Sequence, residues 1–165
     1  INGREDDYTW SAPYVDNSQV VVVRANSGIK SLSDLAGKIV GVQSASAALA
    51  VLEDEEGQKK LADTFASIQE FADYDSAFMN MEAGAVDAVA MDVGVAKYKI
   101  AAGGADKFLL LSEELSTEQY GIGFKKGNTE LRDQVQESLN TLIANGTFYN
   151  LAVKYELTDL AILGK

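Results

Sequence analysis

Short apolar runs alternate with segments of helical periodicity along most of the chain. Runs rich in β-branched and apolar residues predict buried strands at residues 19–24, 38–42, 67–71, 86–91 and 108–111. Between them, apolar residues at helical spacing predict helices at residues 47–55, 75–82 and 93–102. Strands that alternate with helices are typical of a mainly parallel sheet with crossover connections. The pattern therefore predicts the α/β fold class.

The last third of the chain has a different pattern. Residues 120–124 predict a strand or a hinge segment, and residues 129–144 predict a long amphipathic helix. Asn145-Gly146-Thr147 interrupts this helix, and a second helix is expected at residues 148–156.

Polar residues mark the expected starts of several helices. Ser31, followed three residues later by Asp34, is close to a capping box, and Gly37 can end the turn. Ser46 and Asp92 stand directly before the helices expected at 47–55 and 93–102, where each would serve as an ordinary N-cap.

The same two positions are also candidate ligand sites, because ligands of open α/β sheets bind beyond the carboxyl ends of strands. At residues 42–46 a strand runs into a helix, and free backbone N–H groups with a serine hydroxyl can hold a carboxylate or a phosphate. Asp92 follows the strand expected at 86–91, and its carboxylate can hold a ligand ammonium.

Composition narrows the function classes. The chain has 14 Lys and Arg against 25 Asp and Glu, a formal charge of −11, which argues against nucleic-acid binding and against adsorption on anionic lipid. It has no cysteine and no histidine, which rules out zinc sites of the usual spacing, thiol nucleophiles and Ser/His/Asp triads. We expect no catalytic residue, no metal and no cofactor.

Six motifs, in one order, carry a resemblance to a known family. They are Arg4 with WSAPY at 10–14, QVVVVR at 19–24, GIKSLSDLAGKIVGVQ at 28–43, YDS at 74–76 with GAVDAVAMD at 84–92, LSTEQYGI at 115–122, and NGTF at 145–148. In this order the chain resembles the extracellular solute-binding proteins of polar amino-acid ABC importers, of the family 3 type.

The resemblance implies a periplasmic-binding-protein type II-like fold, a clamp of two lobes joined by hinge strands. Residues 1–19 would be a remnant of lobe 1 with the first hinge, residues 20–114 a complete α/β lobe 2, and residues 115–165 the second hinge with the C-terminal helices of lobe 1. Lobe 1 of the family begins with a further segment of strands and helices. We therefore expect a form with a partial lobe 1, which lacks the N-terminal part of that lobe.

The resemblance also implies how a ligand carboxylate would be held. Arg4 matches the arginine that grips the α-carboxylate, because a guanidinium offers two parallel, charge-assisted hydrogen bonds. Ser46 and the N–H of Ala47 match the helix-start pair that holds the same carboxylate from the other lobe. The family usually has Gly and two hydroxyl residues where this chain has Ala45, Ser46 and Ala47, so one hydroxyl is missing.

The other two matched positions concern the rest of the ligand. Asp92 matches the aspartate that takes the α-ammonium, and Gln43 stands where the family contacts the ligand side chain. Which amino acid is bound stays open.

The function implied is the substrate-binding component of an ABC importer, which binds an amino acid between its lobes and delivers it to the membrane permease. Such a protein would be extracytoplasmic, either periplasmic or a membrane-tethered lipoprotein. Two alternatives stay open. One is an enzyme of the same fold, such as a cyclohexadienyl dehydratase. The other is a non-transport module that self-associates as a homodimer, or as a domain-swapped oligomer that exchanges the C-terminal helices.

Overall fold

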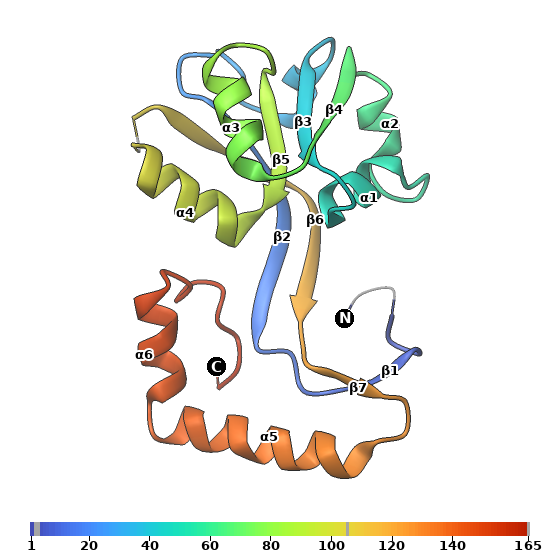
Figure 1. Cartoon of the computed structure of the whole chain (residues 1–165), viewed down its shortest axis with the longest axis vertical. Helices are drawn as coiled ribbons and strands as arrows, with labels where there is room; N and C mark the ends of the chain where they lie inside the picture. The colour runs from blue at the N-terminus through green and yellow to red at the C-terminus, as the bar shows by residue number, and fades with distance from the viewer. Residues whose placement is uncertain (2–3, 105, 165) are drawn as a thin grey trace. The chain divides into compact units, whose positions relative to one another are not determined.

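The computed structural model describes residues 1, 4–104 and 106–164. The chain divides into two compact units: unit 1 comprises Ile1–Asn17 and Glu118–Lys165, and unit 2 comprises Ser18–Thr117. Strands β2 (Val15–Arg24) and β6 (Phe108–Tyr120) each carry the chain from one unit into the other (Figure 1). The two units are described separately below.

Unit 2 is built on a five-stranded sheet in the order β4-β3-β5-β2-β6. Strand β3 (Ile39–Gln43) is parallel to both β4 (Ser67–Phe71) and β5 (Ala88–Asp92). Strand β2 is antiparallel to β5, so the prediction of a mainly parallel sheet is wrong for β2. A strand covered on both faces shows a continuous apolar run whichever way it points, and the run therefore carries no information on direction.

The core of unit 2 lies between this sheet and its helices. Strand β2 is buried along most of its length, with the side chains of residues 20–23 almost wholly shielded from solvent. Leu35, Leu49 and Leu52 pack against the valines of β2 and β3 in one apolar cluster. This is the burial that the β-branched runs predicted.

The helical elements of unit 2 begin close to where the sequence predicted them. They are a short 3₁₀ helix at Leu32–Leu35, and the α-helices α1 (Ala47–Glu53), α2 (Lys59–Ala62), α3 (Tyr74–Glu82) and α4 (Val93–Gly103). The capping box at Ser31 is confirmed, because its backbone N–H donates to the Asp34 carboxylate at 3.0 Å. Helix α2 was not predicted.

Strand β6 is much longer than the expected 108–111, since it continues through polar residues to Tyr120. It lies beside β2 in the sheet, so backbone pairing extends the strand where hydrophobicity gives no signal. Strand β2 likewise begins before its apolar run, at Val15, and includes the buried polar residues Asn17, Ser18 and Gln19.

Unit 1 contains little buried apolar surface. A short ribbon pairs β1 (Tyr8–Trp10) with β7 (Gly123–Lys125), and the helices α5 (Thr129–Ala144) and α6 (Thr147–Lys154) follow. Helix α5 has the predicted bounds, yet none of its residues is buried. The described residues of unit 1 that are buried are Ser11, Asn17, Phe124, Ala152 and Ala161.

Candidate functional site

Several candidate residues of unit 2 lie at one edge of its sheet. Strands β4, β3 and β5 are parallel neighbours, so their carboxyl ends share an edge, and Val42 of β3 is in register with Ala90 of β5. Gln43 is the last residue of β3, and Asp92 is the last residue of β5. Helices α1 and α4 begin at this edge, as expected for a ligand site of an open α/β sheet.

Ser46 acts as the N-cap of α1. Its hydroxyl accepts a hydrogen bond from the backbone N–H of Leu49 at 3.2 Å. Ala45, just before it, has a left-handed backbone with φ of 56°, a conformation that alanine rarely adopts. Ala47 is the exposed first residue of the helix, where backbone N–H groups have no acceptor within the helix itself. This turn can present N–H donors to an anion.

Asp92 stands at the N-cap position of α4, but its side chain makes no capping hydrogen bond. Instead, Oδ1 of Asp92 accepts a hydrogen bond from Nε2 of Gln19 at 3.0 Å. Gln19 is wholly buried in β2 and is the register partner of Asp92. Asp92 is therefore held by the neighbouring strand, and its side chain does not cap the helix that it precedes.

Tyr74 belongs to the same edge and was not among the predicted site residues. It is the first residue of α3, the helix that follows β4, and its hydroxyl oxygen is buried without a hydrogen bond of normal geometry. Burial, followed by the charge of Asp92, raises the pKa of Tyr74 to about 12, while the nearby Ser46 hydroxyl acts in the opposite direction. The signal for it was present in the sequence, because Tyr74 opens the YDS motif at a third strand-to-helix junction.

The Gln43 side chain is half-buried and already has a partner. Its Nε2 donates to the backbone carbonyl of Ala72 at 3.2 Å, in the segment between β4 and α3. The Gln43 amide therefore ties the end of β3 to the segment that leads to Tyr74.

Arg4 lies in unit 1 and is exposed. Its carbonyl accepts the indole N–H of Trp10 at 3.1 Å and the backbone N–H of Asp7 at 3.1 Å. Arg4 and the WSAPY motif, which the sequence analysis grouped together, are thus in direct contact through Trp10 and the Arg4 backbone.

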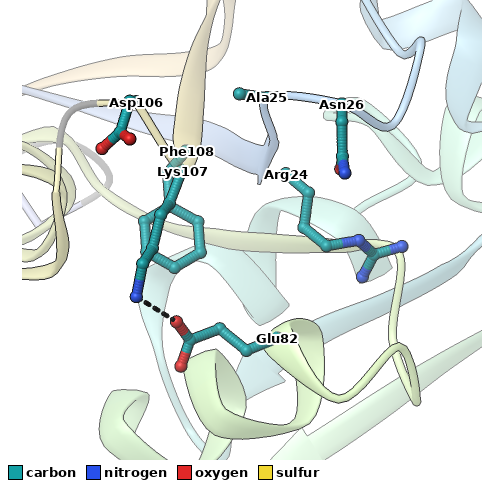
Figure 2. Close-up of a pocket in the computed structure, with 7 residues that line it drawn as sticks. All are labelled: Arg24, Ala25, Asn26, Glu82, Asp106, Lys107 and Phe108. Atoms are coloured by element: carbon teal, nitrogen blue, oxygen red, sulfur yellow. Dashed lines mark hydrogen bonds and ion pairs between the residues drawn. The ribbon is translucent and has the colours of Figure 1, made fainter.

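A cavity of about 500 Å³ lies elsewhere in unit 2 (Figure 2). Arg24, the last residue of β2, donates through Nη1 to the carbonyls of Met81 and Val86, and Lys107 Nζ lies 3.4 Å from Glu82. Since β2 is antiparallel to β5, its end lies at the edge of the sheet away from Asp92. The lining cations are engaged by protein groups, and the cavity contains none of the predicted residues. It is lined by Arg24, Asn26, Glu82, Asp106, Lys107 and Phe108.

Within the part of the chain that the structure describes, no helix combines the length and the apolar character needed to cross a bilayer. Nor do three or more Asp and Glu side chains come together there in an arrangement able to hold a metal ion.

Known proteins agree with this architecture. Residues 2–158 match the model of the bacterial extracellular solute-binding proteins, family 3. The chain belongs to this family, and its fold is that of the type II periplasmic binding proteins. The likeness therefore covers both units.

Three relatives illustrate the similarity. The probable amino-acid-binding protein YxeM of Bacillus subtilis is 28% identical over 162 residues, which are 96% of this chain and 59% of the relative. An ancestral arginine-binding protein, solved with glutamine, is 32% identical with a TM-score of 0.75, covering 94% of this chain and 66% of that one. A substrate-binding protein of an ABC uptake transporter from Streptococcus pneumoniae, solved with histidine, is 25% identical with a TM-score of 0.84. The match covers 98% of this chain and 66% of that one. The chain thus spans less than two thirds of the length of these relatives.

Proposed function

We propose that this chain acts as the substrate-binding component of an ABC importer, binding an amino acid between two lobes and delivering it to the membrane permease. The observation that carries the proposal is the shared edge of β3 and β5, where Asp92 and the Ser46 turn lie in a chain of this family. This edge has a carboxylate and a helix start with backbone N–H groups, and we propose that these pair with the two charges of an amino-acid zwitterion.

The proposed roles follow from the cost of removing a zwitterion from water, since each of its charges must then be paired. Asp92 takes the α-ammonium, while the Ser46 hydroxyl and the Ala47 N–H take the α-carboxylate. Arg4 is proposed to grip the same carboxylate from lobe 1 with two charge-assisted hydrogen bonds. Gln43 faces the ligand side chain.

In this proposal lobe 2 comprises residues 20–114. The hinges and the partial lobe 1 comprise residues 1–19 and 115–165. Ligand groups from both lobes favour the closed clamp, because only that state makes all the contacts. The permease would recognise the closed form. Membership of a family of extracellular solute-binding proteins supports an extracytoplasmic location.

The proposal is for binding without catalysis. The three relatives named above are described as binding proteins, two of them with an amino acid in place. Incubation with prephenate tests the dehydratase alternative, and any stereospecific turnover would contradict the binding role.

A thermal-shift screen with the twenty amino acids tests the proposed function. It is run on this chain and on a version extended at its N-terminus by the corresponding segment of the Bacillus subtilis relative. An amino acid at one hundred times its Kd should stabilise the folded state by about 2.7 kcal/mol. Arg4→Ala and Asp92→Ala should abolish the shift, whereas Asp63→Ala, at an exposed position on α2's C-terminal side, should retain it. Absence of any shift in both chains would refute the proposal.

A second proposal concerns unit 1, whose exposed apolar side chains include Tyr149, Leu151, Val153 and Tyr155. Exposed apolar surface of this kind is commonly covered by another polypeptide. We propose that two copies of the 165-residue chain associate through this face, as a homodimer or by exchange of their C-terminal helices.

A further inference from the structure

Three consecutive residues of β2 are polar and buried: Asn17, Ser18 and Gln19 are 3%, 6% and 0% exposed. Each donates a side-chain hydrogen bond to a carboxylate. Asn17 donates to Glu118 at 2.6 Å and Ser18 donates to Glu114 at 2.8 Å. Both of these acceptors belong to β6.

Gln19 differs from its two neighbours in its acceptor. Its Nε2 donates to Asp92 on β5, with which Gln19 is in backbone register. It is also the most deeply buried of the three, and the four valines that follow it form part of the core. A buried amide is costly unless it is hydrogen-bonded, so this geometry fixes the Gln19 side chain and, through it, the Asp92 carboxylate.

The chemical type of this partner matters for ligand binding. A lysine or an arginine in place of Gln19 would neutralise Asp92 and compete with a ligand ammonium. An amide N–H orients the carboxylate without itself adding a positive charge to the site. Orientation in advance reduces the entropy that ligand binding must otherwise spend on ordering the side chain.

We infer that Gln19 is a positioning residue, which holds Asp92 from the adjacent strand in the orientation that receives the α-ammonium of an amino acid. This inference rests on the proposed function. Strand β2, one of the two strands that pass between the units, thereby contacts the residue proposed to bind the ammonium.

The test compares Gln19→Met with Ser18→Ala. Methionine keeps the length and approximate volume of glutamine but lacks the N–H donor. Ser18→Ala removes the neighbouring buried hydrogen bond on the same strand without touching Asp92, so it controls for loss of a buried bond near the hinge. Circular dichroism and thermal unfolding without ligand establish that both variants fold. Should Gln19→Met not fold, Gln19→Leu also removes the donor with an uncharged side chain that fits a buried site.

Each amino acid that stabilises the protein in the screen is compared, by calorimetry, with the carboxylic acid that has hydrogen in place of its ammonium. For glutamine this analogue is glutaramate, and for histidine it is imidazolepropionate. Gln19→Met should weaken binding of the amino acid about tenfold and leave the analogue within about twofold of wild type. Ser18→Ala should alter the two ligands to the same extent.

Equal loss for both ligands in Gln19→Met, or no loss for either, would overturn the positioning role while leaving the proposed function intact. If the wild-type protein binds no amino acid in either the 165-residue or the extended form, the proposed function fails and this inference fails with it.

Discussion

At the scale of single residues, the edge of unit 2 combines structural roles with proposed ligand-binding roles. Ser46 caps α1, and Asp92 is bound to Gln19. Sequence reasoning found both positions because an N-cap or an acidic residue after a strand is a local signal. It did not find Gln19 or the hydroxyl of Tyr74, since register across strands and burial of one atom depend on contacts between distant segments.

The capping role of Ser46 predicts a stability change that does not depend on ligand. Ser46→Ala removes the acceptor for the Leu49 N–H and should lower the free energy of unfolding by about 1 kcal/mol. Urea unfolding followed by circular dichroism measures this value. Ser44→Ala, at an exposed position in the same turn, is the control and should change it little. Equal effects of the two substitutions would refute the capping role.

Tyr74 predicts a loss of stability in strong alkali. Its pKa is raised to about 12 in the folded protein, so the unfolded chain ionises first as pH rises above the ordinary value of 10. Tyr74 therefore contributes stability that is present below pH 10 and is lost as pH rises through about 12. The free energy of unfolding of Tyr74→Phe should fall less steeply over this interval than that of wild type. Tyr98→Phe, at an exposed position, should behave like wild type.

At the scale of elements, the turn between β3 and α1 contains a strained position. Ala45 has φ of 56°, where a Cβ atom is unfavourable and glycine is tolerated. The family pattern, which places glycine here, agrees with this geometry. The sequence showed the departure from the pattern, and only the backbone conformation shows its physical cost.

Ala45→Gly should therefore raise the free energy of unfolding by about 0.5–1 kcal/mol, because relief of the strained backbone exceeds the added entropy of the unfolded chain. The same substitution at Ala50, within α1, should lower it by about 1 kcal/mol because glycine disfavours helix. Chemical denaturation of the two variants measures both changes in the free energy of unfolding, which should have opposite signs. If Ala45→Gly lowered the free energy of unfolding, the backbone at residue 45 would not be strained by its side chain.

At the scale of the whole molecule, apolar burial is unevenly distributed between the two units. Unit 2 has a continuous core around β2, β3 and α1, whereas no residue of α5 is buried. Local unfolding of a segment that has few buried contacts costs little free energy. Hydrogen exchange measured by mass spectrometry should be slow for residues 20–23 and much faster for α5. Equal protection of the two segments would contradict this distribution.

Self-association through unit 1 is tested by sedimentation. The 165-residue chain should show a concentration-dependent increase in mass, and Leu151→Lys should shift it toward monomer because a charge is introduced into the exposed apolar face. Tyr98→Lys alters an exposed large side chain of unit 2 and serves as the control. A monomer at high concentration would refute the proposal.

The sequence by itself determined the α/β class, the strand-to-helix junctions at Ser46 and Asp92, and the bounds of α5, because these follow from periodicity and capping, which are local. Tertiary structure decided the direction of β2, the extension of β6 to Tyr120 and the bond between Gln19 and Asp92. Each of these depends on which strands become neighbours in the sheet. That pairing is fixed by packing between segments far apart in the chain, to which a hydrophobic run contributes burial but neither direction nor register.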